Sequence, residues 1–188
     1  MIVLTTFERP PPTAVGLIAV SGVAGVTVAA GSWGVGGGLV VVVVTIGAVA
    51  GLVDALSGRI PDRLVVLAST PTLTVLAWAT ANGRGLGALG AVVLGSLVFA
   101  FPLLIVHVVS PDALGFGDVK LAAALGAALG LLDPRLGVLA LCVAAALTAI
   151  VGLATRRDAV PLGPGLVLGA AVAIVTFGQL DQGVLAWR

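Results

Sequence analysis

The chain contains very few charged, aromatic and sulfur-containing residues. Only 9% of its 188 residues are charged and 4% are aromatic, and tyrosine is absent. A soluble domain has about 25% charged residues, so this chain lacks the side chains that would cover a water-facing surface. The shortage also excludes a disordered chain and a nucleic-acid-binding protein with a basic face. The single cysteine, Cys142, excludes a disulfide framework and a cysteine-based zinc site, and we expect it to pack in an apolar run.

Apolar residues make up most of the chain, with 60% hydrophobic residues and a mean hydropathy of +1.25. This composition predicts an all-α, polytopic transmembrane helical bundle. The charged residues separate apolar stretches that suit spans of about 20 residues. The expected spans cover residues 14–30, 37–56, 64–83, 85–111, 136–155 and 159–180. Pro71 and Pro102 fall inside two of them, and we expect both to kink their helices.

One further segment breaks this pattern. The uncharged stretch between Lys120 and Asp133 is too short to span a membrane, and extending it back to Ala113 brings in Asp118 and Lys120. An ionisable residue within a span is a candidate functional residue, because placing it there costs energy. The alternative is that these two charges mark the end of a loop before a short, partly re-entrant helix. The sequence leaves both interpretations open and predicts about seven spans, with six or eight as the alternatives.

The distribution of lysine and arginine predicts the orientation of the bundle. With seven spans, one side holds Arg9, Arg59, Arg63, Lys120, Arg156 and Arg157, and the other holds Arg84, Arg135 and Arg188. The positive-inside rule then places the N-terminus in the cytoplasm. The first span also resembles a secretory signal, with the small residues 28–30 as a cleavage site, but its apolar stretch is longer than such signals usually have. We expect residues 1–188 to form a single membrane domain.

Three short loops on the predicted cytoplasmic side hold the unusual residues. The first begins at Asp54, which closes the second span, and continues to Ile60-Pro61, where the next span starts. An ion pair of Asp54 with Arg59 at the membrane edge is a purely structural explanation for this aspartate. The other two loops have the sequences Gly115-Phe-Gly-Asp-Val-Lys-Leu121 and Val160-Pro-Leu-Gly-Pro-Gly165.

Two aspartates, each at the predicted cytoplasmic end of a span, suggest general acid–base chemistry. Two carboxyl groups in a sheltered site share one proton, so that one activates a water and the other donates to the leaving group. This chemistry needs neither a metal nor a serine or cysteine nucleophile. The single histidine, His107, falls inside the fourth span, where a hydrogen bond between helices is its expected role.

Taken in order, these three blocks resemble the prepilin peptidases, or type IV leader peptidases, which are membrane aspartic endopeptidases of the Gly-x-Gly-Asp type. The resemblance covers residues 39–175 as a peptidase-like core and leaves out residues 1–36, the tail and first span. It implies that Asp54 and Asp118 are the catalytic pair and that Gly115 and Gly117 shape the loop carrying Asp118. Supporting or substrate-binding residues are then Lys120, Ile60, Pro61, Pro161, Gly163 and Pro164.

The resemblance also implies the reaction and its setting. The expected activity is removal of the leader peptide from type IV prepilin-like or pseudopilin precursors at the cytoplasmic face of the bacterial plasma (inner) membrane, without a cofactor or metal. For Lys120 the expected role is electrostatic support or a contact with a lipid phosphate. Bifunctional members also carry a four-cysteine methyltransferase region that this chain lacks, and Asp62 stands where the family often has asparagine.

Two alternative functions remain at this point. Presenilin-like proteases also contain Gly-x-Gly-Asp, but they pair it with a Tyr-Asp motif, and this chain has no tyrosine. A non-catalytic membrane subunit, such as a channel, a transporter or a pilus-assembly component, would use Asp54, Asp118 and Lys120 as ion-path or structural charges. The two aspartates would then lie along a polar pore instead of converging on one water.

Overall fold

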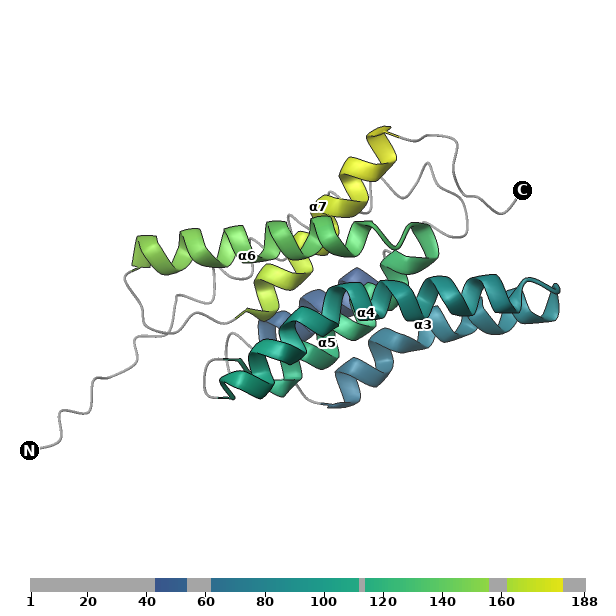
Figure 1. The fold of residues 1–188 in the computed structure, drawn as a ribbon, viewed down its shortest axis with the longest axis horizontal. Helices are drawn as coiled ribbons and strands as arrows, with labels where there is room; N and C mark the ends of the chain where they lie inside the picture. The colour runs from purple at the N-terminus through teal and green to yellow at the C-terminus, as the bar shows by residue number, and fades with distance from the viewer. Residues whose placement is uncertain (1–42, 54–61, 112–113, 156–161, 181–188) are drawn as a thin grey trace, which may run out of the picture.

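The computed structural model describes residues 43–53, 62–111, 114–155 and 162–180, and within these ranges it is entirely helical. A helix over Val43–Val53 is followed by five more, shown in Figure 1. They are α3 (Asp62–Ala81), α4 (Gly85–Val109), α5 (Phe116–Leu132), α6 (Leu136–Thr155) and α7 (Gly163–Leu180). The predicted all-α class is therefore confirmed for the described part of the chain.

The predicted spans agree with the observed helices to within a few residues. The span predicted at 136–155 coincides with α6, and those predicted at 64–83 and 85–111 correspond to α3 and α4. Pro71 and Pro102 lie inside α3 and α4, as expected. The span predicted at 14–30 lies outside the described residues, and the kinks and the single-domain assignment stay predictions.

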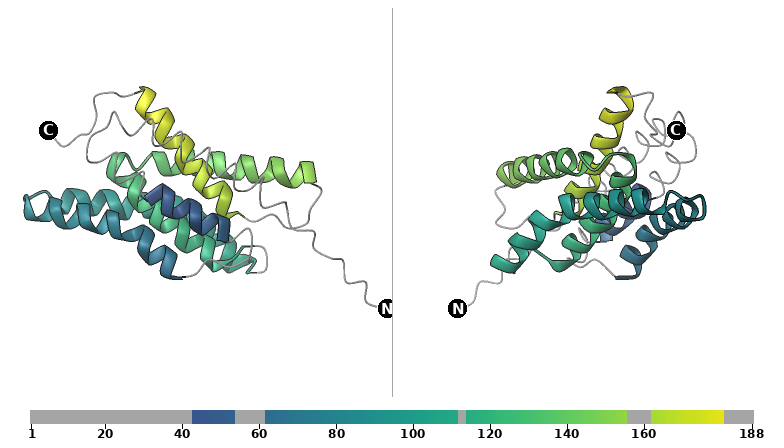
Figure 2. Two further views of the ribbon diagram at one scale, coloured as in Figure 1. Left: turned by 180° about the vertical axis from the view of Figure 1, so that it is seen from behind. Right: turned by 45° about the vertical axis from the view of Figure 1, so that its right-hand side comes forward.

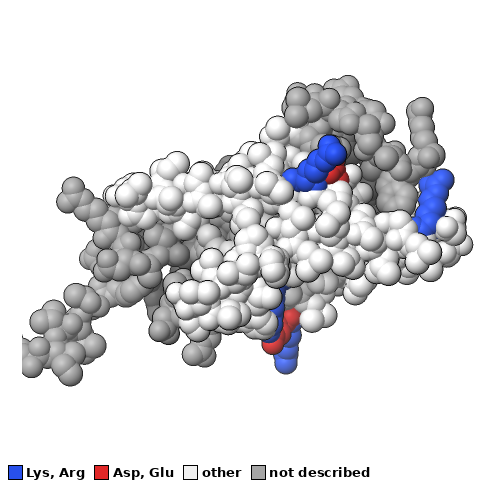
Figure 3. Space-filling model, in the orientation of Figure 1, with Lys and Arg blue, Asp and Glu red and all other residues white. Residues whose placement is uncertain are grey.

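Three of the described helices are long and apolar enough to cross a membrane, namely α3, α4 and residues Leu136–Ala154 of α6. The apolar helices Val43–Val53 and Gly163–Thr176 are shorter, so the count of seven spans stays a prediction. Many large apolar side chains of the three long helices point outward, for example Leu86, which is 90% exposed, and Leu153, which is 80% exposed. Figure 3 shows the same surface as mostly uncharged. Such a surface is suited to lipid and identifies a membrane protein.

Helix α5 is the central helix of the bundle. It contacts α3, α4, α6 and α7, whereas α3 contacts neither α6 nor α7, and Figure 2 shows this arrangement from two further sides. Its length of 17 residues corresponds to about 25 Å at 1.5 Å per residue. The helix is buried along most of its length, including Leu121, Leu125 and Leu129. A side chain at the start of α5 is therefore held by a well-packed helix.

Glycines allow α4 and α5 to pack with their backbones in contact. A Cβ atom on Gly95 of α4 would lie 2.5 Å from the Cα of Gly130, and one on Gly126 would lie 2.5 Å from the carbonyl oxygen of Gly95. No side chain fits at these distances. The abundance of glycine in the sequence thus serves close helix approach, as it commonly does in membrane bundles.

A tight turn joins α3 to α4, so the two helices form a hairpin (Figure 1). Gly83 has φ of +74°, a backbone conformation that favours glycine. The Gly83 N–H donates to the carbonyl oxygen of Thr80, and the Arg84 N–H donates to that of Ala79 over 2.8 Å. These two bonds form a Schellman motif, which satisfies the last carbonyls of α3.

Candidate active site

Asp118 lies in the first turn of α5. Gly115 is the N-cap residue of this helix, and the Asp118 N–H donates to the Gly115 carbonyl oxygen over 3.1 Å. Asp118 is 8% exposed, and it is one of two buried polar or charged residues among those described. The free N–H groups of a first helical turn favour a negative charge there. The helix end thus provides a sheltered but electrostatically suitable place for a carboxylate.

Gly115 leaves space beside the carboxyl group of Asp118. Its φ and ψ are −68° and 141°, which any residue adopts, and a role of Gly115 and Gly117 in shaping the loop stays a prediction. A Cβ atom at Gly115 would lie 3.7 Å from Oδ2 of Asp118. The absence of a side chain at Gly115 therefore keeps the surroundings of the carboxylate open. Gly117 lies half-buried in the first turn of α5.

The helix Val43–Val53 leads directly to Asp54. Asp54 itself, together with Ile60, Pro61 and Pro161, lies outside the described residues. A Cβ atom on Gly47 would lie 3.9 Å from Cδ1 of Leu121, and Leu121 is one turn after Asp118 in α5. The helix that ends at Val53 is thus packed beside the helix that carries Asp118.

The third block of the sequence contacts the helix Val43–Val53. A Cβ atom on Gly51 would lie 3.2 Å from the backbone of Gly163 and Pro164 at the start of α7. Gly47 lies opposite Val167 of α7, at 3.6 Å, so the helix and α7 run antiparallel. This block opens α7, as predicted. Its Gly163 and Pro164 pack against Gly51, which precedes Asp54 by three residues in the chain. They support the end of that helix.

Lys120 forms an ion pair with Asp62, the first residue of α3. The distance from Nζ of Lys120 to Oδ1 of Asp62 is 2.6 Å. The two side chains are 37% and 74% exposed, and an ion pair so open to solvent contributes about 0–1 kcal/mol to stability. Nζ also lies 5.1 Å from the ring centroid of Phe116, within cation–π range. Both roles expected for Lys120, electrostatic support and a contact with a lipid phosphate, stay predictions.

His107, in the last turn of α4, contacts the residues around the start of α5. Its Nδ1 lies 2.7 Å from the carbonyl oxygen of Leu114, and its ring centroid lies 5.4 Å from that of Phe116. The expected hydrogen bond to another helix is therefore wrong, because the partner is the backbone just before α5. The sequence placed His107 in a span but contained no signal for this contact.

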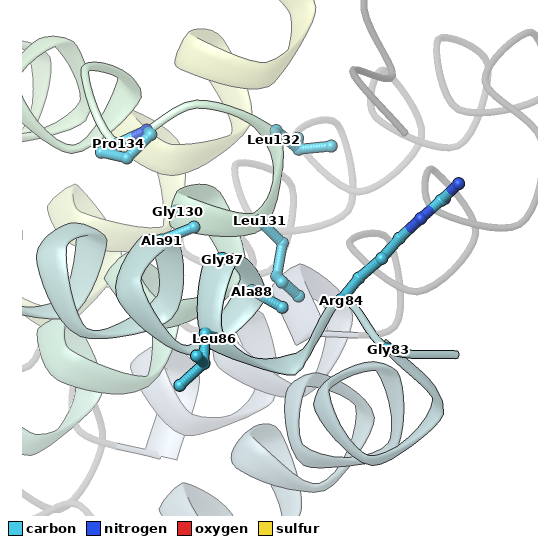
Figure 4. A pocket seen from close by; sticks show the side chains of 10 residues that line it. All are labelled: Gly83, Arg84, Leu86, Gly87, Ala88, Ala91, Gly130, Leu131, Leu132 and Pro134. Carbon is cyan, nitrogen blue, oxygen red and sulfur yellow. The ribbon is translucent and has the colours of Figure 1, made fainter. Parts of the chain in front are cut away.

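The opposite end of the bundle is a different environment. One pocket there is lined by Gly83, Arg84, Leu86, Gly87, Ala88, Ala91, Gly130, Leu131, Leu132 and Pro134, and Figure 4 shows the Arg84 side chain extending away from the others. Gly130 is about 18 Å along α5 from Asp118 at 1.5 Å per residue. The pocket is lined by residues of the turn at Arg84 and of the turn before Arg135, and it lies at the end of α5 opposite to Lys120. Of the four basic residues that the structure describes, Arg63 and Lys120 lie toward the end of the bundle with Asp118, and Arg84 and Arg135 lie at the turns at the other end. The distribution of the other basic residues and the orientation across the membrane stay predictions.

The fold and this helix end define a class of protein, an apolar helical bundle with a sheltered carboxyl group at the start of its central helix. Among the described residues, no cluster of three or more histidine, cysteine, aspartate or glutamate side chains is placed to hold a metal ion. Asp118 supplies a carboxyl group there. A membrane hydrolase that works by acid–base catalysis uses a group of this kind.

Comparison with known protein families gives a direct match. Residues 41–153, more than half of the chain, match the type IV leader peptidase family. The chain belongs to this family, and membership implies an aspartic-type membrane peptidase with prepilins as its substrates. No curated protein and no solved structure matches the chain. The match includes the blocks at Asp54 and at Gly115–Asp118, while the block at 160–165 lies beyond it.

Proposed function

We propose that this chain removes the leader peptide from type IV prepilin-like or pseudopilin precursors at the cytoplasmic face of the membrane, with Asp54 and Asp118 as the catalytic pair. The observation that carries the proposal is the burial of Asp118 at the N-terminus of α5, beside the helix that leads to Asp54. A carboxyl group in an apolar bundle is energetically costly, which makes it a candidate functional residue.

The described residues on both sides of the segment 54–61 contact the first two turns of α5. On one side, the helix Val43–Val53 packs against Leu121. On the other side, Asp62 is bound to Lys120. Residues 54–61 connect these two points in the sequence, and their own positions lie outside the described residues. The contacts of the two flanking helices with α5 support the proposed pairing of the two carboxyl groups.

The proposed reaction uses one water molecule and two protonation states. One aspartate is ionised and takes a proton from the water as it attacks the scissile carbonyl carbon. The other is protonated and donates its proton, finally to the leaving amine. Two carboxyl groups held close together in a sheltered site share one proton, which gives the required pair of states. Gly115 leaves room for the water beside Asp118.

The apolar bundle itself would position the substrate. A prepilin-like precursor has a hydrophobic helix just after its cleavage site. This helix would lie in the membrane against the exposed apolar side chains of the bundle, and the scissile bond would then reach the helix ends near Asp118. Binding of the apolar part thus supplies the orientation on which much of the rate depends.

Co-expression with a precursor tests the proposal. The wild-type chain should remove the leader, read as a mass shift, whereas Asp54→Asn and Asp118→Asn should not. Asp133→Asn is the matched control, because Asp133 lies at the other end of α5 and accepts a hydrogen bond from the Arg135 N–H that asparagine also accepts. If an inserted, folded wild-type chain cleaves none of several precursors, the non-catalytic membrane subunit becomes the better explanation.

A further inference from the structure

Phe116, inside the Gly-Phe-Gly-Asp sequence, is held by side chains from two other positions in the bundle. Its side chain is 47% exposed, so burial alone does not fix it. The ring of His107 lies on it with a centroid distance of 5.4 Å and an interplanar angle of 34°. The ammonium group of Lys120 lies 5.1 Å from its centroid. Phe116 is thus contacted by both α4 and the next turn of α5.

The contact from His107 extends to the backbone of the same turn. Its Nδ1 lies 2.7 Å from the carbonyl oxygen of Leu114. A carbonyl oxygen only accepts hydrogen bonds, so Nδ1 carries the hydrogen and donates it. Leu114 is buried, at 6% exposure, and its carbonyl group is bonded directly to the nitrogen of Gly115. The imidazole therefore holds the residues on both sides of Gly115.

Leu114 and Phe116, which His107 contacts, flank the cap residue that sets the position of Asp118. Gly115 caps α5, and its carbonyl oxygen accepts the Asp118 N–H over 3.1 Å. Moving Leu114 or Phe116 would move this cap and, with it, the first turn of the helix. Lys120 is itself held by Asp62 over 2.6 Å, but this ion pair is largely exposed and contributes little. The half-buried His107 contacts both the Leu114 carbonyl oxygen and the Phe116 ring.

We propose that His107 is a positioning residue that holds the turn before Asp118 through the Leu114 carbonyl oxygen and the Phe116 ring. The proposal rests on the proposed function, in which Asp118 is catalytic. In it, His107 touches neither the substrate nor the reacting water. Its hydrogen bond and its ring contact keep the cap of α5 in the position from which the Asp118 carboxyl group reaches the scissile bond.

Two substitutions separate the hydrogen bond from the ring contact. His107→Asn places an N–H donor at the same number of bonds from the backbone as Nδ1, so it restores the bond to Leu114. His107→Phe keeps a ring against Phe116 but has no donor. Val108→Ala is the control, because Val108 follows in the same turn of α4 and its side chain is 70% exposed.

The experiment uses the purified full chain in detergent with a prepilin-type precursor. We expect His107→Phe to lower kcat by about tenfold or more with KM nearly unchanged, because small displacements of a catalytic group are costly. His107→Asn should retain kcat to within about threefold of wild type, since the donor is kept. In the same samples without substrate, the amides of residues 114–118 should exchange hydrogen faster in His107→Phe than in wild type or Val108→Ala.

The two readouts distinguish the failure of this inference from the failure of the proposed function. If wild type cleaves and His107→Phe has the same kcat and the same exchange rates, the positioning role is wrong and the peptidase activity stands. If wild type cleaves nothing but His107→Phe still exchanges faster at 114–118, the hold on the turn is supported and the proposed function fails. If His107→Phe does not fold, His107→Asn decides. A kcat within about threefold of wild type supports the role of the donor, and a kcat lowered by about tenfold or more overturns it.

Discussion

Gly51 lies directly against the backbone of Gly163, although the two residues are far apart in the sequence. A Cβ atom at Gly51 would be 3.2 Å from the carbonyl carbon of Gly163 and 3.2 Å from the nitrogen of Pro164. Gly51 comes one turn before Asp54, and Gly163 is the first residue of α7. This contact joins the third sequence block to the helix that precedes the first block, three residues before Asp54 in the chain.

Gly51→Ala should weaken both folding and activity. The added methyl group would force the helix Val43–Val53 away from α7, and overpacking of this kind destabilises by about 1–3 kcal/mol. Gly90→Ala in α4 is the matched control, because nothing lies within 4 Å of its Cβ position. Alanine in an open helix is favoured over glycine by up to about 1 kcal/mol. Thermal unfolding in detergent should show opposite shifts, and a stable Gly51→Ala variant with full activity would contradict the account.

Gly95→Ala should be the more damaging substitution in the bundle. Its Cβ atom would lie 2.5 Å from the Cα of Gly130, where no flexible side chain can move aside. We therefore expect α4 and α5 to separate, with a loss of stability larger than that of Gly51→Ala. The same unfolding measurement tests this, with Gly87→Ala as the control, because its Cβ position is also open. Unchanged unfolding in Gly95→Ala would show that α4 and α5 pack differently.

Gly115→Ala should separate activity from stability. A methyl group there would be 3.7 Å from Oδ2 of Asp118, an ordinary contact, and the backbone angles of Gly115 suit alanine. The fold should therefore change by no more than about 0.5 kcal/mol, as for other exposed positions. Cleavage should nevertheless fall by about tenfold, because the methyl group occupies the space proposed for the attacking water. Full activity in this variant would mean that the water approaches Asp118 from another side.

Much of this organisation could be predicted from the sequence, because it depends on local patterns. Charged residues and prolines delimit spans, so the ends of α3, α4 and α6 were predicted to within a few residues. The sequence left open whether Asp118 lies within a span or at the end of a loop before a short helix, and the structure places it in the first turn of α5. The predicted site residues Asp54, Ile60, Pro61 and Pro161 lie outside the described residues, and their roles stay predictions.

Contacts between distant helices could not be predicted in this way. The pair Asp62–Lys120 spans 58 positions, and no local pattern records which helix ends meet. The bond from His107 to Leu114 depends on where α4 ends relative to α5. Cys142 was expected to pack inside the protein, but it is exposed on α6. An apolar residue suits the protein core and the lipid equally well, so hydropathy alone does not choose between them.

A crosslinking experiment would test whether the two aspartates meet. In a Cys142→Ser background, which removes the exposed thiol, Asp54→Cys with Asp118→Cys should be joined by a short bifunctional thiol reagent. Asp54→Cys with Asp133→Cys should not, because Asp133 is about 22 Å along α5 from Asp118 at 1.5 Å per residue. Efficient joining of the second pair, or no joining of the first, would place Asp54 away from Asp118.

The most direct test of the central claim is the cleavage rate of a prepilin-type precursor by the purified chain in a lipid bilayer. The account predicts release of the leader by wild type and by Asp133→Asn, with the same new N-terminus. It predicts no release above background by Asp118→Asn or Asp54→Asn, although both should be inserted and should unfold at the wild-type temperature to within a few degrees. Cleavage at the wild-type rate by either of these two variants would contradict the two-aspartate mechanism.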